Sequence, residues 1–126
     1  MGVQHLSAIT FAVRDMARAI EFYEKCGFAV AYGGKKADFT SLQSDQAFVN
    51  LIATSSYEPK WWGRVIFRVS NADAQYRLMS GAGLKPDAPP QDASWGERYF
   101  HITDLDGHEL SFAQLLAAPE STNSAP

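Results

Sequence analysis

The segment FAVRDMARAIEFYEKCGF, residues 11–28, predicts the end of a strand, a helix and the turn that follows it. Asp15 has the short side-chain acceptor preferred at a helix N-cap, and Gly27 suits the left-handed turn that ends many helices. Between them, apolar residues recur with the i, i+3, i+4, i+7 spacing of a helix with one buried face: Met16, Ala19, Ile20 and Tyr23. The segment therefore predicts a helix of about eleven residues that packs by this face on a sheet.

The same arrangement recurs 56 residues later in the segment FRVSNADAQYRLMSGAGL, residues 67–84, where Asn71 takes the place of Asp15. A second correspondence, with a step of 61 residues, aligns two pairs of strand segments: 38–40 with 99–101, and 49–51 with 110–112. A repeat of this length is usually one supersecondary unit that cannot bury its apolar face alone. The two units are therefore expected to pack on each other or on another chain.

Alternation of apolar and polar residues predicts the strands. In the first unit they are expected at 7–13, 28–32, 37–43 and 47–54, and in the second near 65–69, 97–103 and 109–114. Prolines at 86, 89 and 90 restrict any strand after the second helix to a short one at an edge. The prediction is one α+β domain at 1–116, with two βαβββ units at about 5–54 and 62–115, their helices outside, and a flexible tail at 117–126.

Composition narrows the class of partner. The chain has 126 residues, 46% of them hydrophobic, a formal net charge of -3 and no Lys/Arg block, which argues against a nucleic-acid surface. Its one cysteine, Cys26, excludes an internal disulfide, and no apolar run is long enough to span a bilayer. We expect a cytoplasmic protein that binds a small molecule, with no membrane and no nucleic acid among its partners.

Three features together resemble the vicinal oxygen chelate superfamily, which includes glyoxalase I, extradiol dioxygenases, fosfomycin-resistance enzymes and bleomycin-resistance proteins. They are the paired βαβββ units, the Asp-capped helix that ends in Cys26-Gly27-Phe28, and the turn Asp104-Leu105-Asp106-Gly107-His108. The resemblance covers about residues 5 to 115. It implies that the two units curl around a cavity, which a second subunit often completes.

The resemblance also implies where a metal ion would be held in metal-dependent members. The corresponding positions in this chain are Ala8, Asn50, Arg64 and Ser111. Alanine offers no lone pair, arginine is a permanent cation, and asparagine and serine are weak neutral ligands. We therefore expect no metal and no cofactor. A displaced metal site built on His101 and Glu97, which share a strand face, is the alternative; His5 faces the other way and His108 is expected to be solvated in its turn.

Strand parity predicts the residues that line the cavity: Thr10, Ala12, Asp38, Thr40, Phe48, Asn50, Ile52, Arg64, Ile66, Arg68, Glu97, Tyr99, His101, Glu109 and Ser111. Such a mixed lining suits an organic ligand bound by stacking and directed hydrogen bonds. The two arginines either clamp an anionic group or pair with Glu97, Asp38 or Glu109, and we favour the pairing because a buried arginine needs a carboxylate partner.

Tryptophans extend this candidate surface. Trp95-Gly96-Glu97-Arg98 resembles a Trp-Gly element of bleomycin-resistance proteins, and Trp95 either covers a strand edge or offers a flat face to a planar ring. Trp61 and Trp62 are adjacent and cannot both enter a core, so at least one is expected to meet a ligand or a second subunit. The two arginines depart from the acidic cleft that cationic bleomycin would suit, which favours a different ligand class.

The leading hypothesis is a homodimeric protein that binds and sequesters a small aromatic or antibiotic-like molecule without metal. Its predicted ligand-binding residues are Phe48, Asn50, Trp61, Arg64, Arg68, Trp95, Glu97, Tyr99, His101 and Ser111. The alternatives are a metal-dependent lyase, isomerase or dioxygenase with the displaced site, and a metal-free enzyme with His101 or Tyr99 as acid/base.

Overall fold

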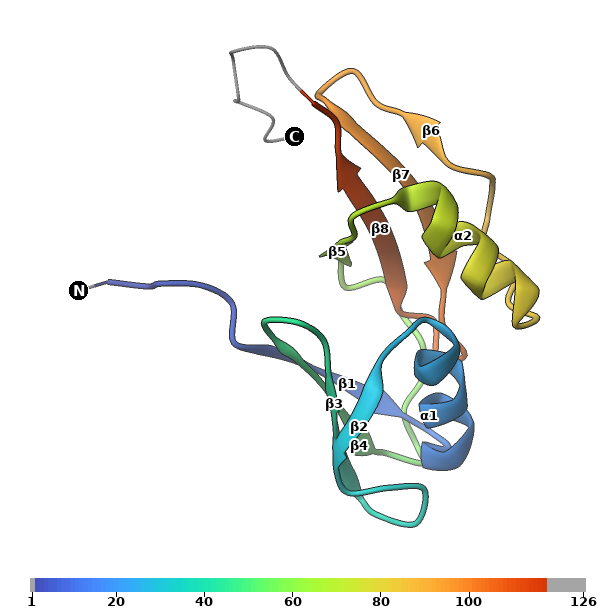
Figure 1. Cartoon of the computed structure of the whole chain (residues 1–126). Coiled ribbons are helices and arrows are strands. Elements are labelled where there is room, and N and C mark those ends of the chain that lie inside the picture. Colours follow the sequence, from blue (N-terminus) through green and yellow to red (C-terminus); the bar gives the residue numbers. More distant parts are fainter. Residues whose placement is uncertain (1, 118–126) are drawn as a thin grey trace. The chain divides into compact units, whose positions relative to one another are not determined.

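The structure is a computed structural model, which describes residues 2–117. The chain divides into two compact units, with the boundary between Lys60 and Trp61 (Figure 1). Each unit has its own sheet and its own helix.

The first unit is a βαβββ arrangement. Its elements are β1 (Ala8–Val13), α1 (Met16–Lys25), β2 (Ala29–Tyr32), β3 (Phe39–Gln43) and β4 (Phe48–Ala53). The strand order in its sheet is β1-β4-β3-β2, in which β1 and β4 are parallel and the other pairs are antiparallel.

The second unit repeats this arrangement. Its elements are β5 (Arg64–Arg68), α2 (Ala72–Gly81), β6 (Gln91–Asp92), β7 (Glu97–Thr103) and β8 (Glu109–Leu115). The order is β5-β8-β7-β6, again with one parallel pair, β5 and β8. The predicted α+β fold with two βαβββ units is confirmed, and the strand after the prolines is a short edge strand as expected.

The helices begin and end at the predicted signals. The Asp15 carboxylate accepts a hydrogen bond from the Arg18 N–H at 3.1 Å, and Asn71 does the same for Ala74 at 2.9 Å. Gly27, with φ of 107°, follows the C-cap of α1 in a conformation that favours glycine. All four of the apolar residues predicted for the inner face of α1 are buried.

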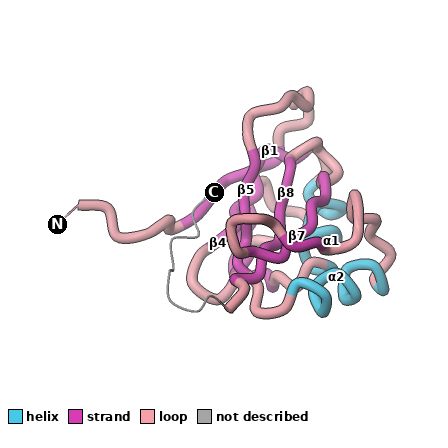
Figure 2. The backbone as a smooth tube through the Cα atoms, turned by 90° about the horizontal axis from the view of Figure 1, so that it is seen from above, coloured by secondary structure: helices cyan, strands magenta, loops and turns pink. Residues whose placement is uncertain are grey.

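Aromatic side chains fill the space between each helix and its sheet. In the first unit the rings of Phe11 and Tyr23 stack with centroids 5.8 Å apart. In the second, Phe100 stacks on Phe112 at 5.4 Å, and Tyr76 from α2 meets Phe100 edge-on at 5.5 Å. Helices and strands are distinguished by colour in Figure 2. Each sheet therefore has one face covered by a helix and one face without a helix of its own unit, which we call the open face.

The predicted orientation of the third strand is wrong. Thr40 is fully buried and pairs with Leu51 of β4, so it lies on the helix-covered face. Phe39 and Ser41 lie on the open face instead, opposite Ile52 and Asn50. The connection between paired strand ends is residues 44–47 in the first unit but 104–108 in the second, one residue longer. A step of 61 residues therefore relates β4 to β8, whereas β3 and β7 differ by 60, and a shift of one residue reverses every side chain.

The turn before β8 also differs from expectation, because His108 is buried rather than solvated. It is 3% exposed, and its Nδ1 accepts a hydrogen bond of 2.8 Å from Nε1 of Trp62. Oδ1 of Asp104 accepts from the N–H groups of Asp106 at 2.9 Å and His108 at 2.8 Å. The buried aspartate thus stabilises the turn by accepting hydrogen bonds from its backbone. His108 in this turn then holds Trp62, one of the two adjacent tryptophans.

Two further predictions concern the rest of the chain. No helix within residues 2–117 is long and apolar enough to cross a membrane. Of the tail predicted at 117–126, residues 118–126 lie outside the described part of the chain.

Candidate functional site

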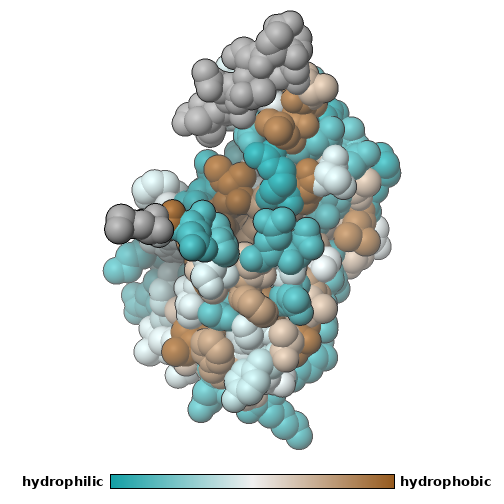
Figure 3. Space-filling view, turned by 60° about the vertical axis from the view of Figure 1, so that its left-hand side comes forward, coloured by the Kyte–Doolittle hydropathy of each residue, from teal (hydrophilic) through white to brown (hydrophobic). Residues whose placement is uncertain are grey.

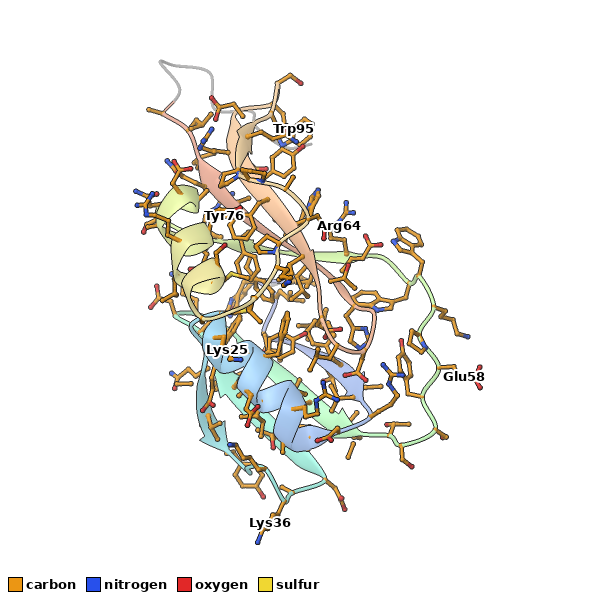
Figure 4. All side chains as sticks on the ribbon, turned by 90° about the vertical axis from the view of Figure 1, so that its right-hand side faces the viewer. Lys25, Lys36, Glu58, Arg64, Tyr76 and Trp95 are labelled. Atoms are coloured by element: carbon orange, nitrogen blue, oxygen red, sulfur yellow. The ribbon has the colours of Figure 1, made fainter. Side chains whose placement is uncertain are left out.

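The open face of the second unit brings together most of the predicted site. The register places Arg64, Ile66 and Arg68 of β5 on this face with Glu109 and Ser111 of β8, and with Glu97, Tyr99 and His101 of β7. In Figure 4, Arg64 and Trp95 lie on the side of the sheet away from α2, whereas Tyr76 comes from α2 itself. The sheet therefore separates the aromatic core from the candidate site.

Glu97 is the central residue of one half of this face. Its Oε2 accepts a hydrogen bond of 3.1 Å from Nη2 of Arg68, and its Oε1 accepts one of 2.9 Å from Nε1 of Trp95. The Glu97 side chain is 9% exposed, and its charge is balanced by that of Arg68. Both oxygens of the buried carboxylate are thus satisfied, as a buried charge requires.

Three rings run along the same face. The indole of Trp95 is nearly parallel to the ring of Tyr99, at an angle of 22° and a centroid distance of 6.1 Å. Tyr99 in turn lies 5.0 Å from the imidazole of His101. Trp95 is 40% exposed, so part of its surface can meet a ligand. Because this set has apolar ring faces and polar edges, it can bind a planar molecule by stacking and direct it by hydrogen bonds.

Gln91, which the sequence did not indicate as a site residue, belongs with this set. Nε2 of Gln91 donates a hydrogen bond of 3.0 Å to the hydroxyl of Tyr99, and the two residues are paired between β6 and β7. The tyrosine hydroxyl keeps its own proton available as a donor. The prolines before residue 91 predicted a short edge strand. A strand of two residues is too short to show which of its side chains lie on which face of the sheet.

The other half of the face is built on Arg64. Nη2 of Arg64 lies 2.7 Å from Oε1 of Glu109, its direct neighbour in the parallel pair β5–β8. The predicted pairing of both arginines with carboxylates of the sheet is therefore confirmed, with Glu109 and Glu97 as the partners. Burial lowers the pKa of His101, and the positive charge of Arg64 lowers this pKa further, so the imidazole is neutral near pH 7.

Two residues on this face, Ser111 and His101, have polar atoms that are buried. Ser111 is 3% exposed, and its hydroxyl donates to the carbonyl oxygen of Phe100 at 3.4 Å. Nδ1 of His101 is buried and has no hydrogen-bond partner among the residues that the structure describes. The Ser111 hydroxyl is therefore already engaged, and the Nδ1 atom of His101 is not accessible from the surface of this face.

Phe48 and Asn50 lie on the open face of the first unit. The Asn50 side chain accepts a hydrogen bond of 2.6 Å from the hydroxyl of Ser41 and donates one of 3.4 Å to that of Thr10. Phe48 is 40% exposed. Ser41 was missed in the sequence analysis because the third strand was assigned the opposite orientation.

The tryptophan pair separates into two environments. Trp62 donates to His108 and packs edge-on against its ring at 5.8 Å. Trp61 is 72% exposed and precedes β5. Trp62 also keeps 42% of its surface exposed, but it is held by His108, so Trp61 is the more accessible of the two.

Comparison with known proteins identifies the family. The sequence profile of the Glyoxalase/Bleomycin resistance protein/Dioxygenase superfamily matches residues 3–112. The chain belongs to this superfamily. A search of curated protein sequences returned no match.

Solved structures with this superfamily fold resemble the chain along most of its length. The bleomycin resistance determinant encoded on the transposon Tn5 is 21% identical, with a TM-score of 0.76, over 89% of this chain and 98% of that one. A bleomycin-binding protein complexed with bleomycin is 22% identical, with a TM-score of 0.73 over the same shares of the two chains. TioX from Micromonospora sp. ML1 is 26% identical, with a TM-score of 0.72, over 90% of this chain and all of that one.

The residues at the metal positions of the superfamily do not suit a divalent ion. Ala8 has no donor atom, Arg64 is a cation bound to Glu109, and the side-chain oxygen and nitrogen of Asn50 are both engaged in hydrogen bonds. No group of three or more His, Cys, Asp and Glu residues within 2–117 is placed to hold a metal ion.

The alternative site on Glu97 and His101 does not fit a metal either. The two residues are four positions apart on β7, which separates their Cα atoms by about 13 Å at the usual strand rise. Metal ligands of this kind lie about 2 Å from the ion. Since both oxygens of Glu97 are also occupied by Arg68 and Trp95, the pair offers no shared site.

Proposed function

We propose that this member of the superfamily binds and sequesters a small aromatic or antibiotic-like molecule without a metal ion, by the open face of its second unit. The observation that carries this proposal is the series of rings formed by Trp95, Tyr99 and His101, which is bordered by the guanidinium groups of Arg64 and Arg68. The aromatic rings supply a series of surfaces on which a planar ligand can stack, and the polar border orients that ligand.

The named neighbours support this choice of function. Two of them are described as a bleomycin-binding protein and a bleomycin resistance determinant, and both share the fold along nearly their whole length. The first of these is named for binding, which needs no catalytic group. At 21–22% identity the ligand itself does not transfer, and the residues of this face have to define it.

Calorimetric titration with planar aromatic compounds tests the proposal. We expect saturable binding near one ligand per chain, quenching of tryptophan fluorescence, and a clear loss of affinity in Trp95→Leu. Leu78→Ala, on the exposed surface of α2, is the matched control and should bind as the wild type does. The proposal fails if no planar compound binds, or if Trp95→Leu binds them all as tightly as the wild type.

We further propose that the protein is a homodimer in the cytoplasm. Four large side chains on the open face of the first unit are partly exposed, at 39% for Phe39, 40% for Phe48, 44% for Ile52 and 68% for Tyr32. Figure 3 shows that, on the side in view, hydrophobic side chains gather in patches between hydrophilic ones. Exposed large apolar side chains on one sheet face are the observation that supports an interaction surface here.

Sedimentation velocity tests the oligomeric state. The wild type should sediment as a dimer, and Ile52→Arg should shift it toward monomer because a charge would be buried in the interface. Leu78→Arg, which adds the same charge to an exposed apolar position of α2, should leave the dimer intact. A monomeric wild type at micromolar concentration would contradict the assignment.

One observation favours a second candidate, a metal-free enzyme. His101 has a lowered pKa and lies 5.0 Å from the ring of Tyr99, so a neutral base and a hydroxyl donor stand on one face. Chromatography of each bound probe after incubation distinguishes the two functions. A binder returns the probe unchanged, whereas an enzyme converts more than one equivalent and loses this conversion in His101→Gln.

A further inference from the structure

The two partners of the ion pair between Arg68 and Glu97 differ in their exposure. The Glu97 side chain is 9% exposed, but that of Arg68 is 56% exposed. The carboxylate is therefore buried in the face while the guanidinium lies above it with its outer edge accessible. The cation thus balances the buried carboxylate and remains accessible to a ligand.

Arg68 also has hydrogen-bonding capacity to spare. An arginine carries five N–H donors, and Arg68 uses one on Glu97 and one, at 3.4 Å, on the carbonyl oxygen of Ala113. The acceptors on this half of the face are used: Oε1 of Glu97 is bound by Trp95 and Oε2 by Arg68. This half of the face therefore has more spare donors than spare acceptors, which suits a ligand rich in oxygen acceptors.

The same carboxylate fixes the distance between the charge and the stacking surface. Arg68 and Trp95 each lie one hydrogen bond from Glu97, and Trp95 continues into the ring of Tyr99. Glu97 is therefore a positioning residue, which holds a guanidinium beside an indole. A ring that stacks on Trp95 or Tyr99 would carry its substituent to the edge of Arg68.

We propose that Arg68 recognises an acidic substituent, and that the ligands of this protein are planar aromatic acids rather than aromatic cations. This inference rests on the proposed binding function and names its ligand class. The second arginine of the face, Arg64, extends the same preference, since one of its donors is used on Glu109 and its side chain is 40% exposed. An ionised acceptor gains most from such donors, because charge-assisted hydrogen bonds are the strong ones.

Three probes with one shape isolate the charge: 2-naphthoate, 2-naphthamide and 2-naphthamidine. They share a ring system and a planar substituent, and differ in being anionic, neutral and cationic near pH 7. Calorimetry should give the naphthoate an affinity roughly tenfold or more above that of the amide, with the amidine weakest. The preference should shrink as salt is added.

Variants locate the preference. Arg68→Gln should reduce the ratio of naphthoate to naphthamide affinity to near one, and Arg68→Lys should retain part of it. Arg77→Gln, which removes one cation from the exposed surface of α2, is the matched control and should keep the wild-type ratio. If Arg68→Gln does not fold, as judged by circular dichroism, the ratio of naphthoate to naphthamide affinity in the wild type, and its dependence on salt, test the preference for acids.

The outcomes separate this inference from the proposed function. Equal affinity for all three probes, or tightest binding of the amidine, overturns the inference and leaves binding of planar molecules standing. Failure of all three to bind removes both. A preference for naphthoate that survives unchanged in Arg68→Gln overturns the assignment to Arg68.

Discussion

At the scale of single residues, neighbouring positions of the same type have opposite roles. Trp61 and Trp62 are indistinguishable in sequence, yet Trp61 is 72% exposed, whereas Trp62, at 42%, donates a hydrogen bond to a buried histidine. Their adjacency in the sequence shows that the two cannot both enter a core. It does not show which one is fixed, because the fixing group, His108, is 46 residues away along the chain and was expected in solvent.

Replacement of the tryptophans should separate these roles. Trp62→Phe removes the indole N–H that donates to Nδ1 of the buried His108, so the free energy of unfolding should fall by about 1–3 kcal/mol. Trp61→Phe should change it by less than about 0.5 kcal/mol. Urea denaturation of the three proteins measures both values, and equal losses in the two variants would contradict the assignment.

His101 should make stability depend on pH. Its pKa is lowered from 6.5 by burial and by Arg64, while Asp87 and Glu109 oppose the shift. A group with a folded-state pKa below its unfolded value takes up its proton first in the unfolded chain, so its contribution to stability is lost as pH falls from about 6.5 through the lowered folded pKa. Above about pH 6.5 both states are neutral at this residue and the contribution is constant.

Comparison of His101→Gln with the wild type tests this. The wild type should lose more stability than the variant between about pH 7 and about pH 5, because glutamine does not titrate. His5→Gln, in the exposed segment before β1, is the control and should follow the wild type. Parallel curves for wild type and His101→Gln would show that the imidazole does not titrate differently in the folded state.

At the scale of elements, helices were predicted well and strand faces less well. The caps, the buried stripe of α1 and the edge position of β6 followed from local signals. The face of β3 did not, since it depends on how many residues form the turn to β4. The residues of the two strands do not reveal that the turn between them is one residue shorter than its counterpart in the second unit. Only the strand pairing shows that Thr40 lies on the helix-covered face and Ser41 on the open face.

The turn between β2 and β3 gives a prediction at this scale. Gly33 has φ of +88°, and a Cβ at this position would lie 2.4 Å from the carbonyl oxygen of Phe39 and 2.9 Å from Cα of Thr40. Gly33→Ala should therefore destabilise the protein by more than about 1 kcal/mol, since both the conformation and the backbone contact are unfavourable.

Gly81 offers a control of the opposite sign. It ends α2 with open space around the position of a Cβ, and its φ is not positive. Gly81→Ala should stabilise the protein by up to about 1 kcal/mol, because alanine restricts the unfolded chain and favours the helix. Thermal unfolding of both variants checks the contrast, and a stabilising Gly33→Ala would refute the geometry of the turn.

At the scale of the whole molecule, the repeat determines what each half can do. Both units keep the βαβββ order and the parallel pair, and their open faces have diverged: hydrogen-bonded Thr10, Asn50 and Ser41 in the first, ion pairs and rings in the second. The superfamily and its fold could be inferred from the repeat and its order. The partners of the arginines could be narrowed to three carboxylates, but the choice between them required the register.

The prediction at the scale of the whole molecule is that divalent metal ions do not bind. Because the four superfamily positions hold Ala8, Asn50, Arg64 and Ser111, Zn²⁺, Ni²⁺ or Mn²⁺ should leave the melting temperature unchanged. A ligand that binds the folded state at a hundred times its Kd would add about 2.7 kcal/mol, which is readily detected. Stoichiometric metal by elemental analysis of protein that had never been exposed to added ions would contradict the prediction.

The shared carboxylate of Glu97 has an evolutionary consequence. Loss of Arg68 alone strands a buried anion, and loss of Glu97 alone releases both the guanidinium and the indole, so each single step toward another specificity is penalised. Joint replacement by Gln at both positions avoids the stranded charge. The preference for acids is thus expected to be gained or lost by coupled substitutions at positions 68 and 97. This is a form of epistasis, in which a substitution at one position is tolerated only together with a substitution at the other.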